Sequence, residues 1–223
     1  MVRSDPDFFA DPGMMRKSTA IVFDIRNFSA HRYYLGQKRG GGTLLTGLVT
    51  DILNDATDIL KSKGEKQSDE HLLNHTGDGF VLVIRGRDNA LKGFRWIAEF
   101  RERVSTRLER YHREKKKKFP KMRRLDPLKY GIGADYGVVL PFKFRSFSRE
   151  ESDGFLGTTV NVAARVEQLT KDHLCNVICT HRLWNALEPI GRPDAGLRAH
   201  SLGEHMLRGF PKSFTLYCLK RTP

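Results

Sequence analysis

Apolar residues follow two different periods along the chain and predict both strands and helices. The β-branched apolar run STAIVFDI predicts a strand that ends near Ile25. A loop with Gly40, Gly41 and Gly42 comes next, and helical spacing then continues to a stop around Lys63-Gly64, where glycine is a typical C-terminal cap. The apolar positions of this predicted helix are Leu44, Leu45, Leu48, Val49, Ile52, Leu53, Ala56, Ile59 and Leu60.

A hairpin and a second helix follow. The short runs HLLNHT and FVLVI flank Gly77-Asp78-Gly79, and an Asp-Gly pair between two strand-like runs is a strong hairpin signal. Helical spacing returns from about Asp88 to His112.

The last third of the chain contains shorter elements. YGIGADYGVVLPF predicts a strand or a strand pair, LGTTVNVAARVEQLT a helix, and CNVICT and TLYCLK two further strands. The order is βαββαβ followed by smaller units, which is typical of ferredoxin-like α+β folds with an antiparallel central sheet and flanking helices. We expect an irregular N-terminal arm over residues 1–18 and one domain over 19–220.

Composition supports a globular chain with an uneven charge. Of 223 residues, 39% are hydrophobic and 10% aromatic, which excludes a disordered protein, and the net charge is +13. The run REKKKKFPKMRR (113–124) carries +7 of that charge, which leaves +6 for the other 211 residues. This run is either a patch for nucleic acid or a membrane surface, or the solvated end of the preceding helix within a basic insertion at about 113–127. We favour the second interpretation because no aromatic ladder interleaves the charges, so that nucleic acid is an unlikely partner; steering of nucleoside triphosphates is a further option.

Three cysteines, Cys175, Cys179 and Cys218, are odd in number and form no CxxC pair. This usage fits buried, reduced thiols in a cytoplasmic protein. The start of the chain lacks an apolar segment of the secretory type, and no apolar run approaches the length of a membrane span, so we expect neither secretion nor a membrane anchor.

Two aspartates stand at positions that can converge. Asp24 lies at the end of the first predicted strand, and Asp78 lies at the tip of the hairpin. Together with the backbone carbonyl of Ile25, the two carboxylates suit a hard divalent cation, Mg²⁺ or Mn²⁺. Gly77 and Gly79 would let the backbone approach phosphate closely. Taken alone, an aspartate in a Gly-Asp-Gly turn is also explained by turn chemistry.

Asn161 and Arg165 lie four residues apart and therefore project from one face of the predicted helix. An amide and a guanidinium placed together could hold a ribose oxygen and a phosphate. An exposed helical pair without a ligand is the alternative.

Several segments, taken in order, resemble the signature segments of class III nucleotide cyclases. The resemblance covers about residues 19–220 and rests on FDIRNFS (Phe23–Ser29), TGDGF (Thr76–Phe80), YGIGADYG (Tyr130–Gly137), GTTVNVAARVE (Gly157–Glu167) and LRGFPKSFTLY (Leu207–Tyr217). It implies a cyclase fold and conversion of a nucleoside triphosphate to the 3′,5′-cyclic nucleotide and pyrophosphate.

The same resemblance implies head-to-tail homodimers with two composite sites. Asp24 and Asp78 match the aspartates that hold two divalent cations, Mn²⁺ or Mg²⁺, and come from one chain. Asn161 and Arg165 match the pair that orients the ribose and stabilises the transition state, and come from the other chain. In the last hairpin, Phe210 stands where the family usually has a lysine for the triphosphate; the flanking Lys212 or Arg208 is the expected substitute, with Lys212 preferred.

The base-reading positions match neither purine pattern of the family. Asn74 stands four residues before Asp78, where adenylate cyclases place lysine and guanylate cyclases glutamate. Gly154 stands seven residues before Asn161, with Asp153 adjacent. An amide offers both a donor and an acceptor, which matches uracil or cytosine and also serves adenine.

This departure resembles the stand-alone pyrimidine cyclases of bacterial anti-phage systems, which signal to a separate cyclic-nucleotide-sensing effector. We therefore expect a uridylate cyclase that converts UTP to cUMP. Cytidylate and adenylate cyclases are the alternatives, and a degenerate cyclase-like domain or a basic nucleic-acid-binding domain is the non-enzymatic one.

Overall fold

A computed structural model describes residues 16–62, 71–122, 124–145, 151–190 and 196–222. One eight-stranded sheet forms its centre, with the strand order β2-β3-β1-β4-β6-β8-β7 and with β5 paired to β4 outside this path. The strands are β1 (Arg16–Arg26), β2 (His71–His75), β3 (Phe80–Ile84), β4 (Lys129–Arg145), β5 (Glu151–Leu156), β6 (Val177–Thr180), β7 (Leu197–Met206) and β8 (Ser213–Arg221).

Five α-helices and two short 3-10 turns connect these strands in the described ranges. They are α1 (Phe28–Gly36), α2 (Gly41–Ser62), α3 (Asn89–Lys118), η3 (Pro120–Met122), α4 (Thr158–Leu169), α5 (His181–Ala186) and η4 (Glu188–Ile190). No helix in these ranges is long and apolar enough to cross a membrane.

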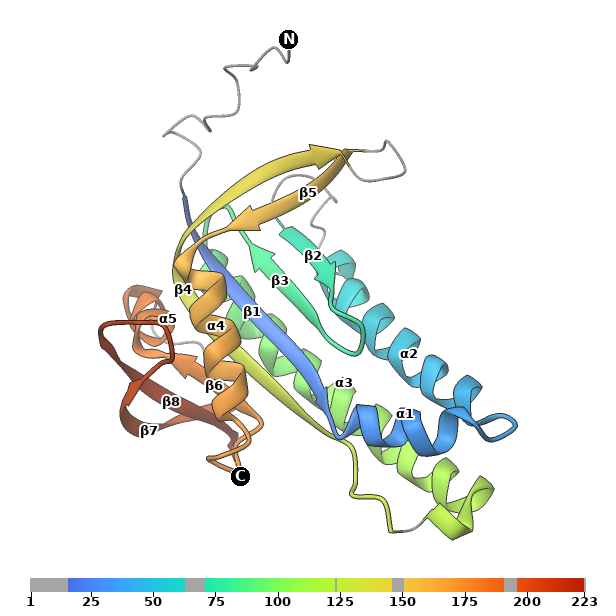
Figure 1. Ribbon diagram of the computed structural model, residues 1–223. Coiled ribbons are helices and arrows are strands. Elements are labelled where there is room, and N and C mark those ends of the chain that lie inside the picture. The colour runs from blue at the N-terminus through green and yellow to red at the C-terminus, as the bar shows by residue number, and fades with distance from the viewer. Residues whose placement is uncertain (1–15, 63–70, 123, 146–150, 191–195, 223) are drawn as a thin grey trace.

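The pairing of the strands gives the sheet its α+β character. Among the described strands, every pair is antiparallel except β4 with β6. β4 is the longest strand: its first part, Lys129–Val139, pairs with β1, and its second part, Leu140–Arg145, pairs with β5. The β4–β5 hairpin consequently extends beyond the rest of the sheet as an arm (Figure 1).

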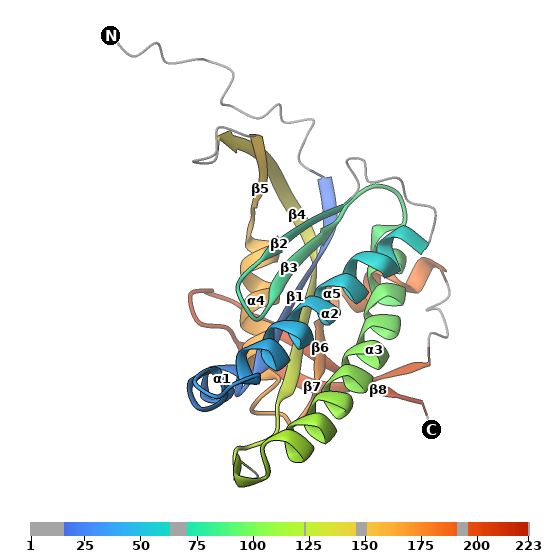
Figure 2. The same cartoon turned by 90° about the vertical axis from the view of Figure 1, so that its right-hand side faces the viewer.

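Helices cover both faces of the sheet. In β1 the alternate residues Ile21, Phe23 and Ile25 join the main core, which α2 and α3 cover, whereas Ala20 joins a smaller cluster with Ala163 of α4. Figures 1 and 2 show α2 and α3 on one side of the sheet and α4 on the other. This layering places α4 on the face opposite to the large helical layer.

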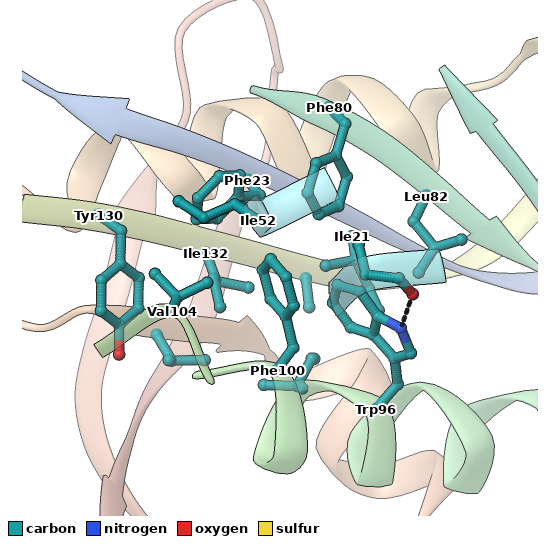
Figure 3. Packing of buried hydrophobic residues seen from close by; sticks show 14 of the residues in the cluster. Ile21, Phe23, Ile52, Phe80, Leu82, Trp96, Phe100, Val104, Tyr130 and Ile132 are labelled. Atoms are coloured by element: carbon teal, nitrogen blue, oxygen red, sulfur yellow. Dashed lines mark hydrogen bonds between the residues drawn. The ribbon is translucent and has the colours of Figure 1, made fainter. Parts of the chain in front are cut away.

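Aromatic rings fill the main core between the sheet and α3. Trp96 stacks on Phe100 with ring centroids 4.4 Å apart, and Phe23 stacks on Phe80 at 5.0 Å (Figure 3). The buried indole N–H of Trp96 donates to the carbonyl of Ala56 at 3.1 Å, which ties α3 to α2. This core holds β1 and β3, the two strands that lead to Asp24 and Asp78.

A second core lies under α4 and contains a disulfide. Val162 and Val166 of α4 pack there with Ile178, and Cys175 is bonded to Cys218 in the same cluster. The prediction of three reduced thiols is therefore wrong for this pair, because β6 brings Cys175 beside β8, which spacing along the sequence does not reveal. Cys179 points to the opposite face of the sheet and is free and buried.

The fold class, the first strand, the β2–β3 hairpin and the long helices are as predicted, and three assignments need correction. The loop expected after the first strand contains a helix, α1, and β1 already begins at Arg16, inside the arm expected for residues 1–18. Residues 1–15 of that arm lie outside the described residues. The third correction concerns the basic run.

The basic run is helical for its first half. α3 continues to Lys118, six residues beyond the predicted end at His112, and η3 follows. Lys115 is buried, and burial lowers its pKa, so the description of the run as a solvated helix end is wrong for this residue. Glu114 forms ion pairs with Arg110 at 3.1 Å and Lys118 at 3.6 Å, which offset part of the local charge.

Candidate active site

Asp24 and Asp78 lie next to each other across the β1–β3 pair. Phe23 pairs with Phe80, so the turn residue Gly79 lies beside Asp24. A Cβ at Gly79 would come within 3.3 Å of the Asp24 Cα and would overlap the carbonyl oxygen of Phe23. The backbone of the hairpin tip therefore touches the end of β1, and only glycine permits this approach.

The electrostatics of Asp24 reflect this proximity. Burial raises its pKa, and the negative charge of Asp78 raises it further. The cations of Lys171 and Arg26 and a hydrogen bond from the backbone N–H of Ile25 act in the opposite direction. Two carboxylates that repel one another favour a cation between them, since a divalent ion removes the repulsion.

The carbonyl proposed as a ligand belongs to a well-packed residue. Ile25 is 2% exposed in the main core and pairs with Tyr130. No group of three or more His, Cys, Asp or Glu side chains with metal-binding geometry occurs among the described residues. The donor set of this chain is thus two carboxylates with backbone oxygen, which fits a hard cation that also binds phosphate oxygens and water.

A polar cluster lies beside Asp24 and was not predicted from the sequence. Arg26 donates to the hydroxyl of Thr170, and Glu167 is buried next to them. Burial, together with the charge of Asp24, raises the pKa of Glu167 to about 7. Gly131 pairs with Asp24 and leaves room for this cluster, because a Cβ there would overlap the Glu167 carboxylate. The end of α4 is consequently close to Asp24 in the same chain.

Asn161 and Arg165 occupy α4 as predicted. Asn161 is exposed, and the guanidinium of Arg165 donates to Gln168 at 3.1 Å. Neither residue lines the groove that contains Asp78. Among the described residues, the lining of this groove therefore includes Asp78 but neither residue of the α4 pair.

The two positions expected to read the base lie on strands that approach one another. Asn74 is exposed on β2, Gly154 is buried on β5, and β2 contacts β5. A Cβ at Gly154 would lie 2.5 Å from the ring of Phe142, so packing of the β4–β5 arm explains glycine here. The side chain of Asp153 lies outside the described residues.

The final hairpin carries the two expected triphosphate cations on its surface. Arg208 and Lys212 are exposed in the β7–β8 turn, where Gly209 adopts φ +90°. Phe210 packs on the second core and on Phe214, with ring centroids 5.5 Å apart. Phe210, which the resemblance places where a lysine was expected, therefore has a packing role.

A groove of about 490 Å³ opens at Asp78 between α1 and α2. Its polar lining includes Ser29 and Arg32 of α1 and Thr50 of α2. Sequence reasoning missed this groove because α1 was interpreted as a loop. Arg32, a basic residue six positions after the end of the first strand, was the available signal.

Solved structures with the same fold are adenylyl and guanylyl cyclases. The adenylyl cyclase CyaB from P. aeruginosa is 16% identical, with 94% of this chain and 96% of that chain covered and a TM-score of 0.69. The guanylyl cyclase Cya2 is 17% identical over 94% of both chains, with a TM-score of 0.67. The guanylate cyclase domain of RhGC from Catenaria anguillulae, in complex with GTP, is 15% identical over 93% and 97%, with a TM-score of 0.62. No protein-family model and no curated protein match the sequence.

Proposed function

We propose that the protein is a metal-dependent nucleotide cyclase that acts on a nucleoside triphosphate. The observation that carries the proposal is the meeting of Asp24 and Asp78 at the end of β1, on a chain with the fold of adenylyl and guanylyl cyclases. Asn161 and Arg165 on one helix supply the remaining polar groups that the reaction needs.

The reaction is an intramolecular phosphoryl transfer. The 3′-oxygen of the ribose attacks the α-phosphorus, the bond from that phosphorus to the bridging oxygen breaks, pyrophosphate leaves, and the 3′-hydroxyl loses its proton. Because both reacting groups belong to one molecule, the protein acts mainly by positioning and by charge stabilisation. Asn161 would orient the ribose, and Arg165 would stabilise negative charge on the α-phosphate.

Asp24 and Asp78, with the carbonyl of Ile25, would hold two divalent cations, Mn²⁺ or Mg²⁺. When bound, such cations supply activation of the 3′-hydroxyl and neutralisation of the leaving pyrophosphate. The carboxylates provide the charge for this binding, and Gly79 provides the close approach of the two strands.

We propose a head-to-tail homodimer with two composite sites. The separation of Arg165 from the Asp78 groove in one chain supports this arrangement, since a second chain could supply the missing pair. Val138 of β4 and Leu156 of β5 are 40% and 59% exposed near the start of α4, and a partner chain would cover them. Arg208 and Lys212 would reach the triphosphate from the final hairpin of the partner.

UTP is the favoured substrate and cUMP the product. Asn74 supports this choice because an exposed amide at the strand edge presents a donor and an acceptor to the base, and Gly154 adds only backbone groups. Cytidylate and adenylate cyclases are the alternatives. We propose that the product is a second messenger of bacterial anti-phage defence that a separate effector senses.

A cytoplasmic location follows from this role, since the substrate and the effector are found there. The disulfide Cys175–Cys218 would then have to resist cellular reductants. Its cysteines are 4% and 2% exposed, and this burial limits thiolate attack.

The experiment that tests the proposal incubates the purified protein with ATP, GTP, CTP or UTP and Mn²⁺ and identifies the products by mass spectrometry. We expect a 3′,5′-cyclic nucleotide, with cUMP dominant, and none from Asp24→Ala. Cyclic AMP as the main product would contradict the pyrimidine assignment. No product from any triphosphate would favour the degenerate or nucleic-acid-binding domain.

A further inference from the structure

Arg32 lines the groove that contains Asp78 and has no partner among the residues that the structure describes. It is exposed on α1, one turn after Phe28, and forms no ion pair or hydrogen bond with another described residue. Two arginines of α3 differ in this respect: Arg107 binds Asp55 at 2.7 Å, and Arg110 binds Glu114 at 3.1 Å. An unpaired guanidinium in a concave site is available for an anionic ligand.

The groove leads away from the metal-binding carboxylates. Gly77 and Asp78 of the hairpin tip form one part of its wall, and residues of α1 and α2 form the others. Ser29 on α1 and Thr50 on α2 also line it, and their hydroxyls make no hydrogen bond to any other described residue, whereas the hydroxyl of Thr46 donates to the carbonyl of Gly42. Among the described residues, Asp78 is the one acidic member of this lining. A ligand whose one end binds the cation at Asp78 would thus extend past hydroxyl groups toward a guanidinium.

We propose that Arg32 binds the terminal phosphates of the triphosphate tail from the same chain that supplies Asp24 and Asp78. This assignment rests on the proposed cyclase function. It changes which chain is expected to bind the triphosphate tail. The tail lies in the α1–α2 groove, and its main cation does not come from Lys212 or Arg208 of the partner subunit. Negative charge increases on pyrophosphate as it leaves, so the same guanidinium also stabilises the departing group.

The volume and the lining of the groove fit a polyphosphate better than an apolar ligand. A volume of about 490 Å³ holds two phosphates with their water. Guanidinium binds two phosphate oxygens at once, and hydroxyls donate to a third. Phe28, Leu45 and Val49 form the apolar part of the lining, and all three side chains also belong to or pack on the main core.

The test uses inorganic tripolyphosphate with Mn²⁺ as the probe, because this ligand has no base and no scissile nucleoside bond. Calorimetry compares wild type with Arg32→Gln, Arg32→Lys and Arg39→Gln. We expect Arg32→Gln to weaken binding about tenfold or more, Arg32→Lys to restore part of it, and Arg39→Gln to leave it unchanged. Arg39 is a matched control: it is exposed after the same helix and lines a different cavity.

A second measurement, of enzyme kinetics, separates this inference from the cyclase assignment. If the enzyme makes a cyclic nucleotide, Arg32→Gln should raise KM for the triphosphate and leave inhibition by the corresponding nucleoside monophosphate unchanged. Equal tripolyphosphate affinity in wild type and Arg32→Gln, or a larger loss in Lys212→Gln, overturns the role of Arg32 whether or not the protein is a cyclase. If tripolyphosphate binding depends on Arg32 but no cyclic product forms, the phosphate-binding role of the groove is supported and the assignment as a cyclase is contradicted. Failure of wild type to bind tripolyphosphate overturns the groove itself.

Unfolding of each variant is followed by circular dichroism to show that the fold is kept. Arg32 is exposed and forms no ion pair within the described ranges, so its substitution should change the free energy of unfolding by less than about 0.5 kcal/mol.

Discussion

Two glycines flank Asp78, and the structure requires them for different reasons. Gly77 adopts φ +94°, a conformation that favours glycine in the tight turn, and a Cβ there would meet open space. Gly79 is restricted by contact, because a Cβ would overlap the carbonyl oxygen of Phe23 and come within 3.3 Å of Asp24. The second glycine therefore allows the hairpin tip to lie directly against the end of β1 at Asp24.

We predict that Gly79→Ala destabilises the protein by about 1–3 kcal/mol, as overpacking does. The hairpin tip must move away from Asp24, so Mn²⁺ binding should weaken as well. Chemical denaturation and Mn²⁺ titration measure the two effects. Gly47→Ala is the control: this helical glycine has open space around its Cβ position, and alanine should stabilise α2 by up to about 1 kcal/mol. If Gly79→Ala and Gly47→Ala had the same stability and the same Mn²⁺ affinity, the close approach of the hairpin tip to β1 would be contradicted.

Some site residues could be predicted from the sequence, and others could not. Asp24 and Asp78 were predictable because a strand end and a Gly-Asp-Gly turn are both visible as local patterns. Arg32 was not, since its relevance depends on a groove between two helices. The packing role of Phe210 and of Gly154 likewise depends on partners far away along the chain.

At the scale of elements, α1 is held by a buried histidine. His31 contacts the Tyr111 hydroxyl through Nδ1 and the Asp126 carbonyl through Nε2, both at 2.7 Å. The carbonyl can only accept, so Nε2 carries the proton and Nδ1 accepts from the tyrosine. His31 and Leu35 are the only buried residues of α1, which explains why apolar periodicity did not reveal this helix.

The buried His31 makes the stability of the protein depend on pH. Burial lowers the pKa of His31 below its usual 6.5, and the charge of Lys115 acts in the same direction, while Asp126 acts against it. Burial likewise lowers the pKa of His112. The unfolded chain therefore binds more protons than the folded one, and stability that is present above about pH 6.5 is lost as the pH falls below it.

We predict that the free energy of unfolding decreases from pH 7.5 to pH 5 by up to about 1.4 kcal/mol per pH unit for each histidine. His31→Gln should reduce this slope. Urea denaturation at several pH values measures it, and an unchanged slope in the variant would exclude His31 as a source.

The disulfide connects the segment after α4 with β8. Cys175 and Cys218 are 43 residues apart in sequence, and their cluster supports Val162 and Val166 of α4, the helix that carries Asn161. We predict that reduction, or the double variant Cys175→Ser with Cys218→Ser, costs about 2–4 kcal/mol. Thermal unfolding with and without reductant measures the loss. The melting temperature of Cys179→Ala should still fall when reductant is added. If reductant leaves the melting temperature of the wild type unchanged, the disulfide bond is contradicted.

At the scale of the whole molecule, the charge is concentrated at one end. The second half of α3 and the segment after it hold the basic run, and Glu114 pairs with two of its cations. None of the proposed catalytic residues lies there. We predict that replacing the exposed Lys116, Lys117 and Lys121 together with glutamine changes kcat less than about twofold, as expected for surface residues away from the site. Loss of activity in a steady-state assay would instead assign the run a role in the reaction.

The composite site is the central claim for the whole molecule. One chain presents Asp24, Asp78 and the groove with Arg32, and α4 of the second chain would present Asn161 and Arg165. In a homodimer, Asp78→Ala damages the metal-binding side of both sites. Arg165→Ala damages the side of both sites that α4 contributes. A mixed dimer regains one intact site with all its groups.

The most direct measurement mixes Asp78→Ala with Arg165→Ala in equal amounts, allows the chains to exchange, and quantifies the cyclic nucleotide formed. Each variant alone should be inactive. Half of the dimers in the mixture contain both chains, and each of these has one of two sites intact, so activity should return to about a quarter of wild type. A mixture as inactive as its components, with chain exchange verified, would contradict a catalytic site shared between two chains.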